Sequence, residues 1–286
     1  MSKPTVNKKV FSIPKSILYT GKLLQIISPK LAMRFAFKLF MTPYKFKRPR
    51  REDKMYEEAT KKMMLVPSLQ KKIQIYKYGT SKKKILLIHG WAGRGTQLFK
   101  IADFFIEKGY AIVSFDATAH GDSEGKTSAM TEFIPSILEI EKQHGPFEFA
   151  VGHSLGSMAL LNAVKQGFDL KKIAIIGTAD SITKICHQFV ERLGLKLKVA
   201  VLLKARLDSE LGFDAEELSA NIAAKEVTIP TLVIHDNNDT DVPVNCAKTV
   251  HKSLENSELM ITDGLGHRRV LCNTEVIEKM NSFFEN

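Results

Sequence analysis

Residues 149–160 read FAVGHSLGSMAL, a short apolar run followed by a turn and then by an apolar helical pattern. Its centre, GHSLG at 152–156, matches the pattern G-x-S-x-G. A serine at such a strand-to-helix turn adopts a strained backbone conformation, with its hydroxyl exposed above the sheet. The turn brings the backbone on both sides of the serine close together. Positions 152 and 156 therefore have no room for a side chain, and both are glycine. The stretch therefore predicts a buried strand, a tight turn and a helix, with Ser154 as a candidate nucleophile.

Similar apolar runs recur along the chain after residue 84. Continuous runs of this kind are typical of strands that are buried on both faces of a parallel sheet. They read ILLIHG (85–90), AIVSFDA (111–117), FEFAVGH (147–153), KIAIIGTA (172–179), PTLVIHD (230–236) and SELMITDG (257–264). Amphipathic helical stretches separate them, which predicts an α/β fold with a mostly parallel, doubly wound sheet and helices on both faces. The alternating stretch 71–79 predicts an antiparallel strand on one edge.

One connection between predicted strands is much longer than the others. Residues 178–230 separate two strands and contain helical stretches, so they predict a helical cap insertion. The insertion follows the carboxyl end of a strand, which is where ligands bind in open α/β sheets.

We expect a basic, mainly helical N-terminal extension at residues 1–70. We expect residues 71–286 to form the α/β domain that carries the cap.

The charge is distributed unevenly between the two regions. The net charge of the 286 residues is +11, but residues 1–84 hold 22 Lys and Arg against 4 Asp and Glu. A helix is expected at 28–43, SPKLAMRFAFKLFMTP, with a basic stretch after it. This helix either docks on the main domain or makes peripheral contact with an anionic membrane surface through residues 28–51. No nucleic-acid partner is expected, because no helix-turn-helix, RNA-binding or OB signature accompanies the cations.

Cysteine usage and the apolar runs bear on location and cofactors. Cys186, Cys246 and Cys272 show no paired metal-ligand spacing, which favours a reducing compartment over a disulfide framework. The basic start at residues 1–16 has no small-residue cleavage site after it, and no apolar run reaches the roughly 18 residues of a membrane span. We expect a cytoplasmic protein, at the inner membrane surface if the membrane alternative holds. No metal or cofactor is predicted, and the oligomeric state stays open.

A serine nucleophile needs a base, and the base needs an orienting acid. His267 follows the last predicted strand, in a glycine-containing loop that can fold over the edge of the sheet. Three aspartates end the preceding strand where a carboxylate can reach an imidazole: Asp236, Asp239 and Asp241.

Acyl transfer also needs donors for the oxyanion. The backbone N–H of Leu155 follows the nucleophile directly, at the start of a helix whose dipole favours negative charge. The glycine-rich turn in ILLIHGWAGRG (85–95) supplies a second candidate donor, the backbone N–H of Trp91.

These motifs and their order resemble those of the serine hydrolases of the α/β-hydrolase superfamily, which include carboxylesterases, lipases and serine aminopeptidases. The resemblance covers roughly residues 71–286. HGWAG (89–93) resembles the oxyanion turn, and FDATAHGDSEG (115–125) resembles the D-x-x-G-H-G-x-S stretch, with Ala119 in place of its first glycine. GHSLG resembles the nucleophile elbow. HDNNDTDVP (235–243) and GLGH (264–267) carry the acid and the base.

The resemblance implies an α/β-hydrolase fold and assigns roles to particular residues. Its D-x-x-V-P spacing selects Asp239 as the acid, while Asp236 stands where the family often has glycine. The triad is then Ser154, His267 and Asp239. The implied supporting residues are His89, Gly90, Gly93, Gly152, His153 and Gly156. Residues 115–125 are expected to shape the pocket floor rather than to react.

The implied activity is carboxylesterase-type hydrolysis of a small-molecule acyl substrate through an acyl-enzyme, with no cofactor. Peptidase, amidase or acyltransferase chemistry suits the same triad. A non-enzymatic relative that binds a ligand or partner is a further alternative. Apolar stretches of the insertion, such as 199–207, favour an acyl or lipid-like group.

Overall fold

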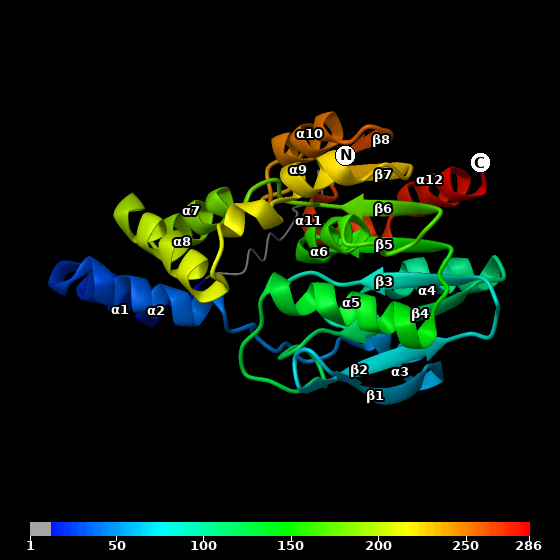
Figure 1. The fold of residues 1–286 in the computed structure, drawn as a ribbon, viewed down its shortest axis with the longest axis horizontal. Helices are drawn as coiled ribbons and strands as arrows, with labels where there is room; N and C mark the ends of the chain where they lie inside the picture. The colour runs from blue at the N-terminus through cyan, green and yellow to red at the C-terminus, as the bar shows by residue number, and fades with distance from the viewer. Residues whose placement is uncertain (1–12) are drawn as a thin grey trace, which may run out of the picture. The chain divides into compact units, whose positions relative to one another are not determined.

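The computed structural model describes residues 13–286, so most of the basic start at residues 1–16 lies outside the described part. The chain divides into two compact units. The smaller unit contains the described residues up to Phe40 together with Thr183–Asp214, and the larger contains Met41–Ile182 together with Ala215–Asn286. Figure 1 follows the chain from blue to red through these segments.

The larger unit is built on an eight-stranded sheet in the order β1-β2-β4-β3-β5-β6-β7-β8 (Figure 1). The strands are β1 (Thr60–Val66), β2 (Lys71–Tyr78), β3 (Lys84–Ile88), β4 (Ala111–Asp116), β5 (Phe149–His153), β6 (Lys172–Ile176), β7 (Thr231–Asp236) and β8 (Ser257–Thr262). The pairs β1–β2 and β2–β4 are antiparallel, and all other neighbours are parallel. The predicted doubly wound, mostly parallel sheet is confirmed.

The first strand changes two expectations from the sequence. β2 is antiparallel as predicted, but it is not the edge strand, because β1 pairs along its outer side from Thr60↔Lys77 to Val66↔Lys71. The expected domain boundary at 70/71 therefore falls inside a β-hairpin, and β1 belongs to the larger unit. The sequence TKKMMLV hides this strand, because only Met64 and Val66 are buried.

Helices cover both faces of the sheet. The helices of the larger unit are α3 (Asp53–Glu58), α4 (Phe99–Glu107), α5 (Met130–His144), α6 (Leu155–Lys165), α9 (Ala220–Ala223), α10 (Val244–Ser253), α11 (Gly266–Arg269) and α12 (Thr274–Glu285). Ile85 and Leu87 of β3 share one core cluster with Phe105 of α4 and Phe284 of α12. On the other face, α6 comes so close that a Cβ on Gly156 would lie 2.9 Å from the side chain of Ile88. Each large apolar side chain buried in these layers contributes about 1.5–3 kcal/mol.

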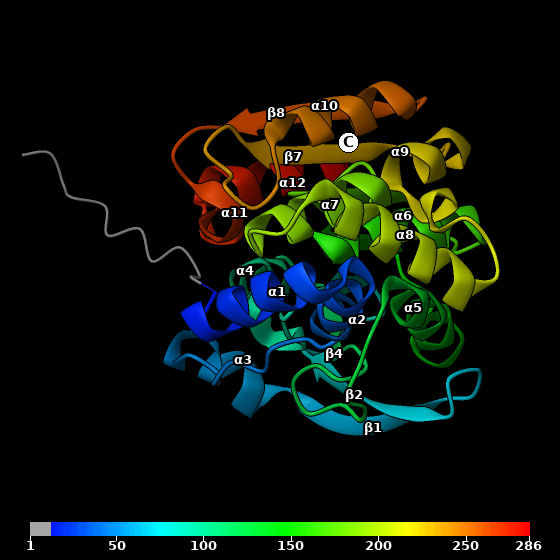
Figure 2. The ribbon, with the colours of Figure 1, turned by 90° about the vertical axis from the view of Figure 1, so that its left-hand side faces the viewer.

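The smaller unit joins the first helices of the chain to helices inserted between β6 and β7. It contains α1 (Lys15–Ile27), α2 (Pro29–Phe40), α8 (Leu197–Leu211) and all but the first residue of α7 (Ile182–Arg192) (Figure 2). The helix expected at 28–43 is confirmed as α2, which packs along α8. The Arg206 guanidinium lies 5.5 Å from the ring centre of Phe37, and the rings of Phe40 and Phe189 are 5.1 Å apart.

The helical insertion is present, but its extent differs from the expected 178–230. Only Thr183–Asp214 belongs to the smaller unit. The stretch that follows contains α9 and packs on the larger unit, where Ala220, Ala223 and Ala224 are fully buried. The side-chain amide of Asn162 in α6 donates to the carbonyl of Leu218 at 2.9 Å. Small alanines allow this close packing against α6, so the stretch is part of the α/β layers.

Candidate active site

Ser154 lies at the turn between β5 and α6 in a conformation that is unusual for a residue with a side chain. Its φ is 53° and its ψ is −119°. The Ser154 N–H donates to the carbonyl of Ile176 in β6 at 2.8 Å, and its carbonyl accepts from the N–H of Ser157 at 3.0 Å. Such strain costs on the order of 1–3 kcal/mol and persists only where the surrounding structure imposes it. Here the hydrogen bonds to the N–H and the carbonyl of Ser154 impose the strained conformation.

The two glycines of the elbow lie where side chains would collide with backbone. A Cβ on Gly152 would be 2.7 Å from the Cα of Ser157, and a Cβ on Gly156 would be 2.5 Å from the carbonyl oxygen of His89. Real Cβ atoms essentially never come this close to other heavy atoms. Both positions therefore require glycine, and the sharp turn presents Ser154 at the carboxyl end of β5.

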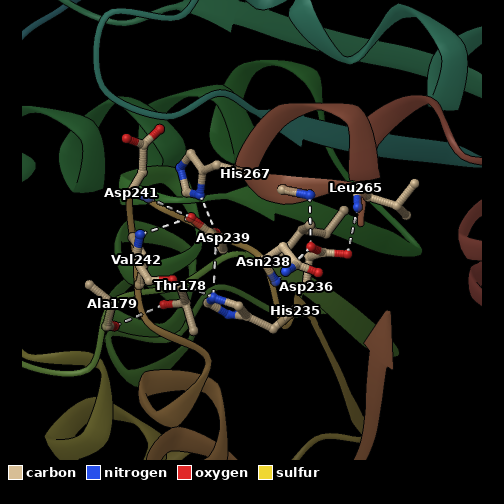
Figure 3. Close-up of polar contacts among 12 residues, drawn as sticks. Thr178, Ala179, His235, Asp236, Asn238, Asp239, Asp241, Val242, Leu265 and His267 are labelled. Carbon is tan, nitrogen blue, oxygen red and sulfur yellow. Dashed lines mark hydrogen bonds and ion pairs between the residues drawn. The ribbon is translucent and has the colours of Figure 1, made fainter. Parts of the chain in front are cut away.

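His267 and Asp239 form a close pair between the ends of β7 and β8 (Figure 3). Nδ1 of His267 lies 2.6 Å from Oδ2 of Asp239. Because a carboxylate only accepts, the imidazole donates its Nδ1–H, which leaves Nε2 with a free lone pair. A Cβ on Gly177 would lie 3.1 Å from Cε1 of His267, so a residue without a side chain flanks the pair.

The Asp239 carboxylate is held in its charged form. Its side chain is 1% exposed, and Oδ1 accepts the backbone N–H groups of Asp241 at 2.8 Å and Val242 at 2.9 Å. Burial raises the pKa of Asp239, but the hydrogen bonds from His267, Val242 and Asp241 together outweigh burial and hold this pKa below its usual value. An ionised acid next to Nδ1 stabilises an imidazolium.

His153 links the histidine loop to the nucleophile turn. Its Nε2 lies 2.9 Å from the backbone carbonyl oxygen of His267, so Nε2–H donates. The two imidazole rings are 4.7 Å apart at their centres. Burial lowers the pKa of His153 to about 3, so the ring is neutral at physiological pH. The residue directly before Ser154 thus fixes the backbone that carries His267.

Asp236 holds the loop of His267 from its other end (Figure 3). Oδ1 accepts the N–H groups of Asn238 at 2.9 Å and Gly266 at 2.8 Å. Oδ2 accepts the Thr262 hydroxyl at 2.8 Å and the Leu265 N–H at 3.0 Å. Burial raises the pKa of Asp236, yet these donors outweigh burial and lower it overall. The carboxylate therefore connects the loops after β7 and β8.

A second imidazole lies beside Asp239. His235 is fully buried at the end of β7, and its Nε2–H donates to the carbonyl of Val242 at 2.9 Å. The same Nε2 is 3.4 Å from Oδ2 of Asp239 (Figure 3). Burial lowers the pKa of His235, which keeps the ring neutral. His235 thus closes the loop 236–242 around the carboxylate.

The glycine-rich turn after β3 passes beside the nucleophile. A Cβ on Gly90 would be 2.8 Å from the Cβ of Ser154, so the backbone that leads into Trp91 runs next to this serine. Gly93 closes the turn with its N–H on the carbonyl of Gly90 at 3.0 Å, and Ala92 between them has a φ of 55°. The turn is tight and strained, as expected for backbone that approaches a reacting group.

His89 connects this turn to the end of β4. Its Nδ1 is 2.7 Å from the carbonyl oxygen of Gly90, and its Nε2 accepts the N–H of Ala117 at 3.0 Å. These partners require the neutral tautomer with a proton on Nδ1. Burial lowers the pKa of His89 to about 4, in agreement with this tautomer.

Residues 115–125 form a hydrogen-bonded turn around Asp116. Its carboxylate accepts the N–H of Gly95 at 2.6 Å, the N–H of Asp122 at 2.8 Å and the hydroxyl of Tyr76 at 2.8 Å. Ala119 has a φ of 61°, which explains why glycine is usual at this position. Asp116 thus holds the glycine-rich turn through Gly95.

The structure brings together the residues that the sequence singled out at the ends of β3, β5 and β7 and after β8. Leu155 is the first residue of α6, directly after Ser154, and its N–H belongs to the unpaired start of that helix. Asp241 contributes its backbone N–H to Asp239. Two contributors were not foreseen, namely His235 and the loop-binding role of Asp236. A histidine directly after the apolar residues of a buried strand was the available signal for His235.

Solved structures with a similar fold include two esterases and a bromoperoxidase. The esterase Pf2001 of Pyrococcus furiosus matches 85% of this chain and 98% of its own, with a TM-score of 0.66 and 17% identity. The esterase EaEST of Exiguobacterium antarcticum matches 79% of this chain and 100% of its own, with a TM-score of 0.62 and 17% identity. The bromoperoxidase of Bacillus anthracis matches 79% of this chain over 100% of its own length, with a TM-score of 0.61 and 18% identity. These matches confirm the α/β-hydrolase fold.

Two curated proteins are similar in sequence over part of the chain. The lysophosphatidylserine lipase ABHD12 of Danio rerio is 30% identical over 191 residues, which are 61% of this chain and 48% of that protein. A serine hydrolase-like protein of Dictyostelium discoideum is 32% identical over 82 residues, 27% of this chain and 23% of that protein. The matched segments therefore span less than half of either relative.

Two family models together cover most of the larger unit and the inserted helices. A model described as TAP-like protein matches residues 213–286. A model described as serine aminopeptidase, S33, matches residues 79–221, which is half of the chain and contains the glycine-rich turn and the elbow. The chain belongs to the serine aminopeptidase S33 family of α/β hydrolases.

Proposed function

We propose that this protein is a serine hydrolase that cleaves a carboxylic ester, or a related acyl bond, through an acyl-enzyme. Ser154 acts as the nucleophile, His267 as the general base and acid, and Asp239 as the orienting acid. The observation that supports this most is the 2.6 Å contact between Nδ1 of His267 and the buried Asp239 carboxylate. The His153 hydrogen bond ties that pair to the residue before Ser154.

The proposed reaction has two steps. Oγ of Ser154 attacks the acyl carbon while Nε2 of His267 takes the hydroxyl proton, and the imidazolium then gives that proton to the leaving alcohol. Water, deprotonated by the same nitrogen, then attacks the acyl carbon. The bond to Oγ breaks, the acid leaves, and the imidazolium returns the proton to Oγ of Ser154. Asp239 keeps the proton of the neutral imidazole on Nδ1 and stabilises the imidazolium. Its low pKa supports this role, because the carboxylate is ionised throughout.

Backbone N–H groups of Leu155 and Trp91 are the proposed oxyanion donors. Leu155 begins α6, where the helix dipole favours an anion. Close passage of Gly90 beside Ser154 supports a donor from the next peptide, that of Trp91. Removing one such donor typically lowers kcat by about 10²–10³-fold, so this turn is as important as the proton transfer.

Labelling with a fluorophosphonate probe tests the proposed nucleophile directly. The unchanged protein should be labelled on Ser154, as read by mass spectrometry, and should hydrolyse p-nitrophenyl esters. Ser154→Ala should lose labelling and turnover, the latter on the order of a million-fold, while keeping its circular dichroism spectrum. Ser157→Ala is the matched control for a second elbow serine, and it should retain labelling. Absence of labelling in the unchanged protein would instead favour the non-enzymatic, ligand- or partner-binding alternative.

The bond that is cleaved needs a separate comparison. Ester hydrolysis of a small acyl compound is proposed, since the apolar composition of the inserted helices favours an acyl chain. The lipase named among the relatives acts on a lipid ester, whereas the family description names a peptidase. Matched ester, thioester and anilide substrates with one acyl group should rank the ester first by kcat/KM. A higher kcat/KM for the anilide would favour peptidase or amidase chemistry. Transfer of the acyl group to an added alcohol would favour acyltransferase chemistry.

We further propose a cytoplasmic location, from the cysteine usage. Fractionation of cells that express the full chain tests this, with the protein expected in the cytosol or attached to the inner membrane surface.

A further inference from the structure

The smaller unit exposes an unusual set of large apolar side chains. Ile26 is 82% exposed, and five others on the same two helices are more than half exposed. We call these six side chains the apolar face: Tyr19, Leu23, Ile26 and Ile27 of α1, and Leu197 and Val201 of α8. Single exposed apolar residues are ordinary, but a group at helical spacing on two helices of one unit marks an interaction surface.

The spacing of these residues places them on common faces of their helices. Tyr19, Leu23, Ile26 and Ile27 follow the i, i+4, i+7, i+8 pattern of one helical stripe, and Leu197 and Val201 are four apart. The N–H of Lys196 donates to Oε1 of Gln25 at 2.6 Å. This bond ties the residue before α8 to the last turn of α1, on a side of α1 away from its exposed stripe. The apolar stripe of α1 and the exposed start of α8 are therefore held in the same unit.

The opposite side of α1 is already packed, which explains why this stripe faces outward. Gly21 is buried, and a Cβ there would lie 3.3 Å from the side chain of Leu195 and 3.6 Å from that of Phe35. The helix is therefore docked within its unit through Gly21. Its other stripe, Tyr19, Leu23, Ile26 and Ile27, is exposed.

The charge around the apolar face is strongly positive. Residues 13–40 and 183–214 contain 11 Lys and Arg against four Asp and Glu. Three of these acids lie at the end of α8 or beyond it, where Asp208 and Asp214 pair with Lys204, and Glu210 pairs with Arg206. Residues 13–40 contain no acid at all.

Lysines beside the apolar face are left without carboxylate partners. Lys15 and Lys22 lie on α1, and Lys196 and Lys198 lie at the start of α8; all four are exposed, and none forms an ion pair with another residue of the described chain. Apolar side chains flanked by lysines match an anionic lipid surface, where the chains enter the headgroup boundary and the ammonium groups meet phosphates.

We propose that the apolar face of α1 and α8 binds the surface of an anionic phospholipid membrane. The binding is interfacial, since no helix within residues 13–286 has the length and apolar composition to cross a bilayer. A second copy of the chain fits this face less well, because symmetric pairing would bring two strongly positive surfaces together.

The membrane contact expected at residues 28–51 involves different side chains. Phe37 and Phe40 of α2 pack against Arg206 and Phe189 inside the smaller unit. In the larger unit, Lys45 donates to the carbonyl of Gly121 at 2.9 Å, and Arg48 pairs with Asp122 at 3.4 Å. These groups have partners within the chain, so the proposal rests on α1 and α8 instead.

Vesicle sedimentation of the full chain tests the proposal without any substrate. Vesicles of phosphatidylcholine mixed with phosphatidylglycerol should carry the protein down, and vesicles of phosphatidylcholine alone should carry down much less. The double variant Ile26→Glu and Ile27→Glu should lower the partition coefficient by about tenfold or more for each isoleucine. Lys22→Glu with Lys198→Glu should reduce the preference for anionic vesicles. Leu65→Glu makes the same change at an exposed apolar residue of β1, and it should sediment like the unchanged protein.

Three outcomes would overturn the proposal. The first is equal sedimentation of the Ile26→Glu, Ile27→Glu variant and the unchanged chain. The second is an equal loss in the Leu65→Glu control. The third is that vesicles bind nothing while the unchanged chain dimerises in sedimentation velocity and the double variant does not, which would make the face a subunit interface. Circular dichroism checks that each variant is folded, and hydrolysis of soluble esters is a separate readout that these changes should leave unaltered.

Discussion

His153 donates its Nε2–H to the backbone carbonyl of His267 at 2.9 Å, across 114 residues of sequence. The donor directly precedes the elbow serine, and the acceptor belongs to the loop after β8. One hydrogen bond therefore sets the position of the histidine loop relative to the turn that carries Ser154. The ring is buried and neutral, so the bond does not depend on pH in the physiological range. His153 is thus a positioning residue.

Replacing His153 with phenylalanine should lower kcat while leaving KM nearly unchanged. The phenyl ring keeps most of the packing but has no donor for the His267 carbonyl. A misplacement of about 1 Å in a catalytic group can reduce the rate about 100-fold, so we expect a loss of about 10- to 100-fold in kcat. Steady-state hydrolysis of a p-nitrophenyl ester measures both constants.

His153→Gln is the matched control, because its side-chain amide nitrogen can take the place of Nε2. It should recover most of the kcat that His153→Phe loses. Equal losses in both variants would show that ring shape matters here and that the hydrogen bond does not.

Replacing Asp236 with asparagine should destabilise the protein and reduce turnover together. The carboxylate accepts four hydrogen bonds, and an amide can accept on only one of its two terminal atoms. Hydrogen bonds to a charged group contribute about 1.5–3 kcal/mol, so we expect the free energy of unfolding to fall by about 2–3 kcal/mol at pH 7. Urea unfolding measures this difference.

The pH dependence of that difference follows from the lowered pKa of Asp236. A carboxyl whose pKa is lowered by folding stabilises the protein above its unfolded-state pKa, near 3.8, and this stabilisation is lost as the pH falls through the folded-state pKa. The gap between the unchanged protein and Asp236→Asn should therefore be largest at pH 7 and should shrink below pH 3.8. A gap that stays constant down to pH 2.5 would contradict the assignment of an ionised, loop-holding carboxylate.

Much of the larger unit could be predicted from sequence because its central strands, β3 to β7, are buried on both faces. Such strands read as continuous apolar runs. β4 to β8 each lie within a predicted run, and β3 begins one residue before its run. The elbow was also readable, since close backbone contacts restrict 152 and 156 to glycine. β1 was missed because an outer strand needs few buried residues, and only Met64 and Val66 carry its signal.

The composition of the smaller unit could not be predicted from local patterns. An amphipathic helix shows that one face will be covered, but not which segment covers it. The packing of α2 against α8 joins residues that are far apart in sequence, through contacts such as Phe40 with Phe189. The role of Asp236 was hidden for a related reason, because its partners in 262–266 belong to another loop.

Replacing His120 with phenylalanine should make stability less dependent on pH. The ring is buried between Trp91 and Phe133, at 5.3 and 5.4 Å between centres, so a phenyl ring suits the site. Burial lowers the pKa of His120 to about 3, whereas an unfolded histidine titrates near 6.5. Between these values only the unfolded state takes up the proton, so stability falls as the pH falls below 6.5.

One such histidine lowers the free energy of unfolding by up to about 1.4 kcal/mol for each pH unit below 6.5. Between pH 7 and pH 5, the free energy of unfolding of His120→Phe should fall by about 2 kcal/mol less than that of the unchanged protein. Urea unfolding at the two pH values measures both. The lost hydrogen bond to the Thr118 carbonyl affects both pH values alike and cancels in the comparison. The same pH dependence in both proteins would mean that His120 is charged in the folded state at pH 5.

Replacing Ser154 with glycine should yield a protein that is inactive but more stable than Ser154→Ala. Both variants lack the hydroxyl, so both should lose ester hydrolysis. Alanine keeps the Cβ that is strained at a φ of 53°, whereas glycine occupies this region freely. The greater flexibility of glycine in the unfolded chain offsets part of the gain, and we expect a net difference of about 1 kcal/mol in favour of Ser154→Gly. Urea unfolding of the two variants at pH 7 measures it. If Ser154→Ala were the more stable protein, the elbow would not be strained, and the backbone would hold the nucleophile without stored energy.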